Sequence, residues 1–159
     1  MTEFYTVSFF GHREVNDYFG VEVQTENIIR ALLSSDRYLA FQVGRNGEFD
    51  LLVSSIIHRL KKEGYDDNNV HILILPYDTA EYRNNREIFD KYYDEVEICE
   101  KSCTAHYKSA IQIRNKAMVD RSDLVVFYLE YKSGGAYQTY KYAVKQKKKI
   151  ILINEEEDA

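Results

Sequence analysis

The sequence contains no tryptophan, one proline and two cysteines, and no apolar run approaches the length of a membrane span. A helix needs about 20 consecutive apolar residues to cross a bilayer, so we expect no transmembrane segment. The first residues, MTEFYTVSFFGHRE, have no basic stretch followed by an apolar one, which argues against a signal peptide. Two cysteines are too few for a disulfide framework. These absences predict a cytoplasmic protein without a membrane partner.

An excess of basic charge is also missing, since 21 Lys and Arg residues stand against 26 Asp and Glu residues, for a net charge of −5. Proteins that attract nucleic acid through their overall charge are basic. We therefore expect no nucleic-acid partner. A length of 159 residues and a hydrophobic content of 45% are typical of one globular domain. We assign that domain to residues 1–154 and an acidic tail to residues 155–159.

Apolar runs typical of strands alternate along the chain with segments of helical periodicity. Strands are expected at residues 5–10, 38–43, 70–75, 95–99, 124–129 and 149–153. Helices are expected at residues 21–33, 48–62, 81–93, 104–119 and 135–147. This alternation predicts an α/β fold, a three-layer Rossmann-like sandwich with a mainly parallel central sheet. In such sheets ligands bind beyond the carboxyl ends of the strands, so the loops after the strands are the candidate sites.

A glycine pair, Gly134-Gly135, follows the apolar strand at residues 124–129 and opens a helix. Glycines let a backbone approach a ligand closely, and a helix N-terminus attracts anions. The corner is either a phosphate site or a plain tight turn. Ala136, Tyr137 and Thr139, in the first turns of the same helix, are included as candidate ligand-binding residues.

The loop after the first strand carries Gly11, His12 and Arg13. An arginine pairs bidentately with phosphate, and the histidine is a candidate donor to a ligand oxygen or a ribose hydroxyl. The alternative is a surface turn whose arginine forms a salt bridge. We include all three residues among the candidate ligand-binding residues.

The loop after the second strand reads GRNGEFD and supplies Gly44, Arg45, Gly47 and Asp50. Two glycines three residues apart before a helix are typical of a backbone nest for an anion. Asp50, in the first helical turn, complements the helix dipole, or it holds a ribose hydroxyl or an adjacent loop. The loop is neither a G-x-G-x-x-G fingerprint nor a Walker A sequence, which argues against a conventional NAD enzyme or ATPase.

Two further candidates lie on other elements. Tyr77 follows the third strand and is positioned to stack on a base, although a tyrosine that closes a strand is the commoner outcome. Arg114 occupies the inner face of its helix, where an unpaired charge is costly. Its partner is either structural, such as Asp120 or Asp123, or a ligand phosphate.

Cys99, Cys103 and His106 form a C-x-x-x-C-x-x-H string of metal-ligand types. A closed zinc site needs four ligands, and the sequence has no second cluster. We therefore expect no metal and no cofactor. No Ser-His-Asp or Cys-His arrangement for a catalytic nucleophile is detectable either.

The motifs GHRE, VGRNGEFD, LPY, RNKAMVDRSDLVV and GGAYQTYKYA, in this order, resemble the SLOG superfamily of Rossmann-like domains. The resemblance covers nearly the whole chain and is strongest to the small stand-alone YpsA-like branch. LOG phosphoribohydrolases, which cut the N-glycosidic bond of nucleoside monophosphates, are more distant members. The resemblance implies nucleotide binding and association into homo-oligomers.

Carried over by motif, the resemblance implies that Gly134 and Gly135 bind phosphate and that Thr139 is the family threonine that follows. It assigns Arg114 to the position of the active-site arginine of LOG enzymes. The earlier loop motifs are matched by Gly11, Gly44, Gly47 and Asp50.

One departure concerns the LOG motif P-G-G-x-G-T-x-x-E, whose glutamate is catalytic. Ser133 replaces the proline, and the glutamate position falls on Tyr142 or Ala143. The sequence therefore predicts a protein that binds a nucleotide or a nucleotide-derived signalling ligand, as a sensor or a sequestering protein. The alternative is an N-glycosidase or phosphoribohydrolase of nucleoside monophosphates that uses Arg114, and a third possibility is a scaffold that has lost its ligand.

Overall fold

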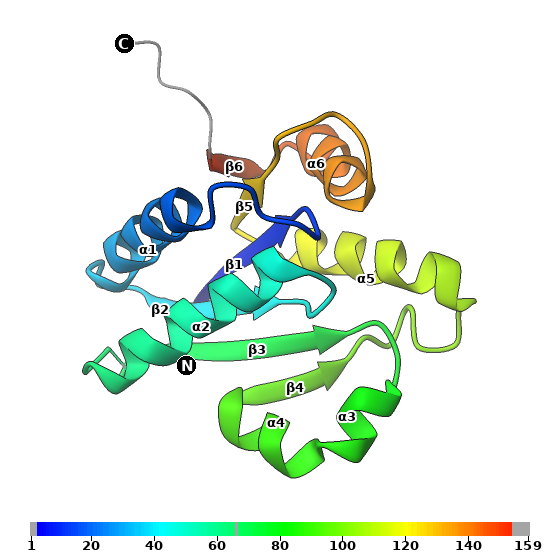
Figure 1. The fold of residues 1–159 in the computed structure, drawn as a ribbon, viewed down its shortest axis with the longest axis horizontal. Coiled ribbons are helices and arrows are strands. Elements are labelled where there is room, and N and C mark those ends of the chain that lie inside the picture. The colour runs from blue at the N-terminus through cyan, green and yellow to red at the C-terminus, as the bar shows by residue number, and fades with distance from the viewer. Residues whose placement is uncertain (1–2, 66, 154–159) are drawn as a thin grey trace.

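The computed structural model describes residues 3–65 and 67–153, and the predicted acidic tail lies outside these ranges. The fold is α/β and Rossmann-like, with one central sheet in which all pairs of neighbouring strands are parallel (Figure 1). The strand order is β4-β3-β2-β1-β5-β6. The strands are β1 (Phe4–Gly11), β2 (Tyr38–Val43), β3 (Asn69–Leu75), β4 (Glu95–Ile98), β5 (Leu124–Tyr128) and β6 (Lys149–Ile153). The predicted fold class is confirmed.

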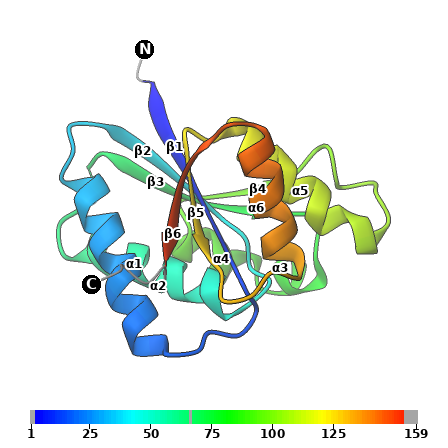
Figure 2. The ribbon, with the colours of Figure 1, turned by 90° about the horizontal axis from the view of Figure 1, so that it is seen from above.

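Helices cover both faces of the sheet. They are α1 (Tyr18–Leu33), α2 (Glu48–Lys62), α3 (Ala80–Asn84), α4 (Arg86–Tyr92), α5 (Tyr107–Arg121) and α6 (Gly135–Lys145). Seen from above, α1 and α2 lie on one side of the sheet, and α5 and α6 lie on the other (Figure 2). Among the described residues, no helix is both long enough and apolar enough to cross a membrane.

The central strands are apolar because both of their faces are covered. Every residue of β5 is buried. Val126 and Tyr128 join the core beneath α1 and α2, whereas Val125 and Phe127 join the core beneath α5 and α6. The alternation of side chains along one strand thus supplies two separate cores.

Several helix boundaries differ from the prediction, and two of the differences have a visible cause in the backbone. Helix α1 begins at Tyr18, three residues early, because Asp17 has a left-handed backbone and its side chain accepts a hydrogen bond from the Gly20 N–H. The helix predicted at residues 81–93 is two short helices, interrupted at Asn85, whose φ of −134° is not helical. The spacing of apolar residues could not predict either the early start of α1 or the interruption at Asn85, because each depends on the backbone conformation of a single residue.

The topology creates a switch point between β1 and β5. From β1 the chain runs outward through β2, β3 and β4, and then returns to place β5 on the other side of β1. The loops after β1 and β5 therefore diverge, which leaves a crevice at the carboxyl ends of the two strands.

A buried histidine in β3 makes folding sensitive to pH. His71 is 1% exposed, its Nε2 lies 3.1 Å from Ser54 Oγ, and its Nδ1 has no hydrogen-bond partner among the described residues. Burial lowers the pKa of His71 from 6.5 to about 3. Below pH 6.5 the unfolded chain therefore binds a proton that the folded chain excludes. Folding stability should fall as the pH decreases from about 6.5, by up to about 1.4 kcal/mol per pH unit from this group.

The measurement is urea unfolding of the wild type and of His71→Leu between pH 7.5 and pH 5. Whatever its absolute stability, the variant should have a shallower dependence on pH. Equal slopes in the two proteins would contradict the assignment of this proton to His71.

Candidate functional site

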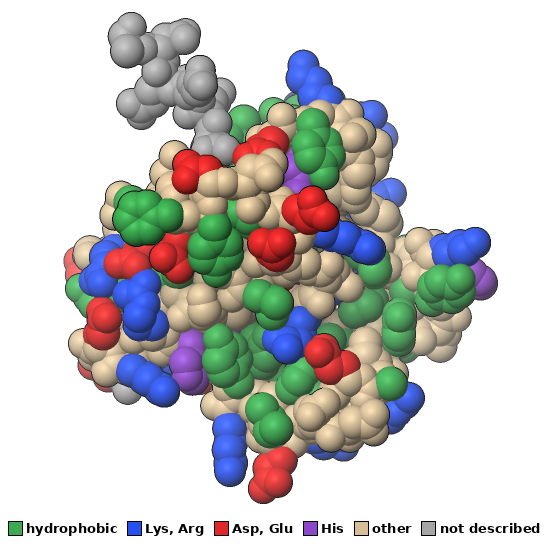
Figure 3. Space-filling model, in the orientation of Figure 1, with side chains coloured by type: hydrophobic (Ala, Val, Ile, Leu, Met, Phe, Trp, Pro, Cys, Tyr) green, Lys and Arg blue, Asp and Glu red, His purple; other side chains and the backbone are tan. Residues whose placement is uncertain are grey.

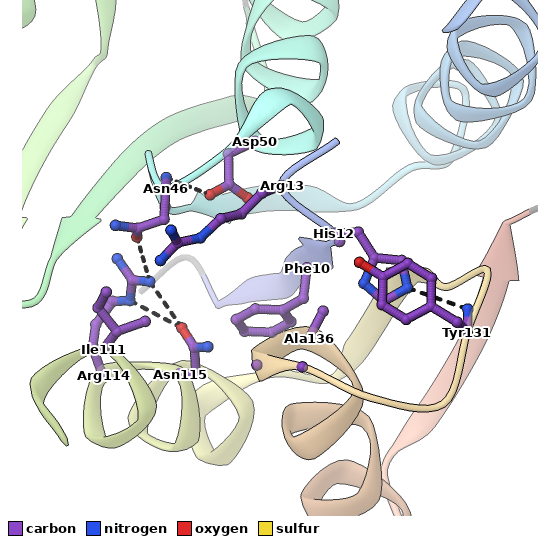
Figure 4. Close-up of a pocket in the computed structure, with 14 residues that line it drawn as sticks. Phe10, His12, Arg13, Asn46, Asp50, Ile111, Arg114, Asn115, Tyr131 and Ala136 are labelled. Atoms are coloured by element: carbon purple, nitrogen blue, oxygen red, sulfur yellow. Dashed lines mark hydrogen bonds between the residues drawn. The ribbon is translucent and has the colours of Figure 1, made fainter. Parts of the chain in front are cut away.

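A pocket of about 250 Å³ opens at the switch point (Figure 4). Its walls come from the carboxyl ends of β1, β2 and β5 and from one face of α5. The lining residues are Phe10, Gly11, His12, Arg13, Gly44, Asn46, Asp50, Ile111, Arg114, Asn115, Tyr131, Gly134, Gly135 and Ala136. Segments far apart in the sequence thus meet at the edge where the alternating pattern predicts a ligand.

The Arg114 guanidinium forms one side of this pocket and is 3% exposed. It donates hydrogen bonds to the Ile74 carbonyl at 3.0 Å, to Asn46 Oδ1 at 2.8 Å and to Asn115 Oδ1 at 2.9 and 3.1 Å. Burial lowers the pKa of Arg114, and the charge of Asp50 opposes that shift. Burial also raises the pKa of Asp50. The opposite charges of Arg114 and Asp50 thus each offset part of the cost of burying the other.

Neither predicted carboxylate partner of Arg114 contacts it. Asp120 accepts a hydrogen bond from Tyr142 Oη at 2.6 Å, and Asp123 accepts one from the Thr6 N–H at 2.8 Å. Proximity in sequence was misleading because the Arg114 side chain points toward the ends of other strands. Its partners are structural, and they come from β3, from the loop after β2 and from α5 itself.

Asn115 extends this network to α6. Its Nδ2 donates to Thr139 Oγ1 at 3.1 Å, and the Thr139 hydroxyl donates to the Gly135 carbonyl at 3.0 Å. Thr139 is fully buried and does not line the pocket. Its hydroxyl therefore positions the first turn of α6.

The N-terminus of α2 faces the loop after β1 and carries two acidic residues, Glu48 and Asp50, in its first turn. The Glu48 N–H donates to the Arg13 carbonyl at 2.8 Å, and Asp50 accepts from the Asn46 N–H at 2.8 Å. A Cβ on Gly47 would lie 2.6 Å from Arg13 Cα. Gly47 therefore allows the loop after β1 to pass closely over α2, and this helix end offers little to an external anion.

The N-terminus of α6 is different. Gly134 has a φ of 89°, a left-handed conformation that favours glycine, and no side chain caps the helix. The first turn of α6 contains no acidic residue. The exposed Arg13 lines the same pocket, and no carboxylate in the described part of the chain forms an ion pair with its guanidinium. This corner combines a positive helix end with an available positive charge.

An aromatic pair forms the opposite rim (Figure 4). The rings of His12 and Tyr131 are stacked, with centroids 3.7 Å apart and planes at 5°. Burial lowers the pKa of His12, with Glu130 opposing the shift. The ring is therefore neutral at pH 7, and its Nε2 accepts the Tyr131 N–H at 3.4 Å. Tyr131 is 53% exposed, so the stack holds one of its faces and leaves the side chain open to solvent.

Most of the predicted site residues meet in this pocket. It gathers Gly11, His12, Arg13, Gly44, Asp50, Arg114, Gly134, Gly135 and Ala136. Sequence reasoning omitted Phe10, Asn46, Ile111, Asn115 and Tyr131. Asn46 was detectable because it lies inside the GRNGEFD loop, whereas nothing in the sequence marks Tyr131, which lies in a loop without a regular pattern.

Five predicted residues do not line the pocket, and Gly47 and Thr139 are two of them. A third, Arg45, forms an ion pair with Glu81 at 2.9 Å. Tyr137 stacks near Tyr140, with ring centroids 6.1 Å apart, and borders a different hollow. Tyr77, half-buried after β3, is also absent from the lining residues.

The cysteine and histidine string does not assemble a metal site. Cys99 is buried and Cys103 is exposed, and both are free thiols. His106 instead accepts the Lys108 N–H at the start of α5. Within residues 3–65 and 67–153, no group of three or more His, Cys, Asp or Glu side chains is placed to hold a metal ion.

Two solved structures are similar to this chain. DNA processing protein A from Helicobacter pylori, which binds single-stranded DNA, matches 96% of this chain and 66% of its own, with a TM-score of 0.66 and 16% identity. DNA processing protein A from Streptococcus pneumoniae matches 96% of this chain and 51% of its own, with a TM-score of 0.69 and 14% identity. The chain thus spans just under two thirds of the first protein and about half of the second. No family model and no curated protein matches it.

These comparisons correct three predictions. The assignment to the YpsA-like branch of the SLOG superfamily is wrong, because no family model supports it and the similar structures are DNA processing proteins. The prediction of a small-molecule partner without nucleic acid is contradicted, since the H. pylori neighbour binds single-stranded DNA. The same finding contradicts a nucleotide-derived signalling ligand, and the N-glycosidase alternative is not favoured either.

The buried hydrogen-bond network around Arg114 predicts that replacing this arginine lowers the stability of the fold far more than replacing Arg13. Arg114→Met should destabilise the fold by about 3 kcal/mol, because it leaves the Ile74 carbonyl and Asn115 Oδ1 without their buried donor and the half-buried Asp50 without its neighbouring positive charge. Arg13→Met should change the free energy of unfolding by less than about 0.5 kcal/mol, because this side chain is exposed. Urea unfolding of both variants tests this, and similar stabilities would show that Arg114 is not a structural residue.

Proposed function

We propose that this chain binds single-stranded nucleic acid along the carboxyl edge of its sheet, with one backbone phosphate between Arg13 and the N-terminus of α6. The observation that carries the proposal is the pairing of an exposed guanidinium with an uncapped helix end in one pocket. Free N–H groups at a helix start bind phosphate oxygens, and arginine matches phosphate with two parallel hydrogen bonds.

Two exposed aromatic rings, one at the rim of the pocket and one on α5 beyond it, support a strand rather than a mononucleotide. Tyr131 is 53% exposed at one rim, and Tyr107 is 62% exposed one helical turn before Ile111, which lines the pocket. Each tyrosine stacks on a histidine and is followed by a lysine, Lys132 or Lys108. Stacking platforms beside a basic track are the usual means of holding single strands.

The acidic net charge is compatible with this function because the relevant charge is local. On the face shown in Figure 3, basic and acidic side chains are interspersed, without a broad basic surface. Few phosphates are therefore neutralised. Since the salt dependence of binding to single strands scales with that number, we expect modest affinity and a shallow slope of log K against log salt, about −1 to −3.

The H. pylori neighbour lends further support. It binds single-stranded DNA and shares this fold over 96% of the present chain. The low identity means that no residue role is transferred from it. The assignment of residues rests on the pocket of this chain alone.

The direct test is fluorescence anisotropy with a labelled thymidine oligonucleotide of about 16 nucleotides at low salt. Arg13→Ala and Tyr131→Ala should each weaken binding about 10-fold, because one removes a phosphate partner and the other removes a stacking surface. A duplex of the same length should bind less tightly, since its bases are not free to stack on the protein.

Two matched variants serve as controls. Tyr131→Phe keeps the ring and should retain near wild-type affinity, and Arg83→Ala removes an exposed arginine of α3 and should do the same. The proposal is wrong if the wild type does not bind, or if Arg83→Ala weakens binding as much as Arg13→Ala.

A further inference from the structure

A second hollow borders the pocket at the switch point. It measures about 230 Å³, and its lining residues come from the loop after β5, from α6 and from β6. Tyr131 lines both cavities. A single strand with a phosphate between Arg13 and the N-terminus of α6 therefore reaches this hollow once it has crossed Tyr131.

The lining of this hollow is largely aromatic and apolar. Tyr137 and Tyr140, neighbours on α6, border it together with Leu129 and Leu152. The Tyr140 ring packs edge-on against the buried Phe127, with centroids 5.4 Å apart, which holds the ring in place. A nucleobase is a flat ring, and its stacking on aromatic side chains tolerates every base. The hollow therefore suits a base of any kind.

One carboxylate, that of Glu130, also borders the hollow. Hydrogen bonds from Tyr128 and Asn16 lower the pKa of Glu130, so this group is ionised at pH 7. Its negative charge disfavours a phosphate inside the hollow. The uncharged base is then the part of a nucleotide that fits there, and the phosphates stay outside.

The positive charge of the chain is concentrated on α6 and beside it. Residues 131–149 contain six lysines and no aspartate or glutamate, in a chain with a net charge of −5. Lys132 lines the hollow, and Lys141 Nζ lies 5.7 Å from the centroid of the Tyr137 ring. Lys145 follows Lys141 by four residues, on the same face of the helix. These three lysines are exposed, and none forms an ion pair with a carboxylate that the structure describes.

We propose that this hollow holds one base of the bound single strand, and that the strand then follows α6 with its next phosphates against Lys141 and Lys145. The inference rests on the proposed function, because it extends the strand that is held by Arg13 and the N-terminus of α6. Bases on tyrosines with phosphates on lysines are the usual arrangement in proteins that hold single strands. The path of the nucleic acid thus turns from the carboxyl edge of the sheet onto α6.

The first test measures affinity of the full chain for a labelled thymidine oligonucleotide of about 16 nucleotides. Tyr137→Ala should weaken binding about 10-fold, because it removes a stacking surface, whereas Tyr137→Phe should bind like the wild type. K141Q/K145Q should weaken binding and make the slope of log K against log salt shallower by about 1.4, since each phosphate contact to a single strand contributes about 0.7.

Two matched variants serve as controls for these measurements. Tyr65→Ala removes an exposed tyrosine, and K62Q/K91Q removes two exposed lysines. None of these residues lines either cavity. Both variants should bind with the affinity and the salt slope of the wild type, and circular dichroism checks that every variant is folded.

Photo-crosslinking then locates the base. An oligonucleotide with 5-bromouracil in place of thymine is irradiated in complex with the wild type, which is then digested with trypsin. Crosslinks should appear in the peptide of residues 133–141, which contains both tyrosines of α6 that border the hollow, as well as in the peptide of residues 122–132, which contains Tyr131.

The outcomes separate this inference from the proposed function. Crosslinks confined to residues 122–132, wild-type affinity for Tyr137→Ala, or an unchanged salt slope for K141Q/K145Q would each overturn the inference and leave the proposed function standing. Control variants that weaken binding as much as the variants on α6 would overturn the inference as well. A wild type that does not bind the oligonucleotide overturns the proposed function, and the inference with it.

Discussion

The burial of the Arg114 guanidinium is the constraint on which the pocket depends. A charge at this depth is costly unless hydrogen bonds within the protein replace those lost to water. Its partners are the Ile74 carbonyl at the end of β3, Asn46 in the loop after β2, and Asn115 on its own helix. Asn115 also donates a hydrogen bond to Thr139, which links the Arg114 network to the first turn of α6. One side chain thereby fixes the relative positions of three elements around the pocket.

Different groups of the pocket hold the fold together and face the solvent. Arg114 has its hydrogen bonds inside the protein, so its charge is largely committed to the fold. Arg13 and the N-terminus of α6 remain available at the surface of the same pocket, opposite the stacked ring of Tyr131. A preformed concave site with few positioned polar groups is what a ligand-binding edge requires. Under the proposed function, this local charge would receive a backbone phosphate even though the overall charge of the chain is negative.

Much of the architecture was predictable because buried parallel strands and amphipathic helices leave strong periodic signals. The meeting of the loops that contain Arg13, Asp50 and Gly134 followed from the rule that strand ends share one edge. The partners of Arg114 were not predictable, since they depend on side-chain directions across elements distant in sequence. Tyr131 was missed for a related reason: its role arises from a stack with His12 that only the folded loops create.

The central claim is that the carboxyl edge at the switch point is the nucleic-acid interface. A titration of the ¹⁵N-labelled chain with an unlabelled thymidine oligonucleotide, followed by amide chemical shifts, tests it most directly. We predict that the largest shifts belong to the amides of Arg13, Tyr131 and Gly135 and that they saturate together. If those amides stay unmoved while shifts appear on the outer surfaces of α1 or β4, the account is contradicted.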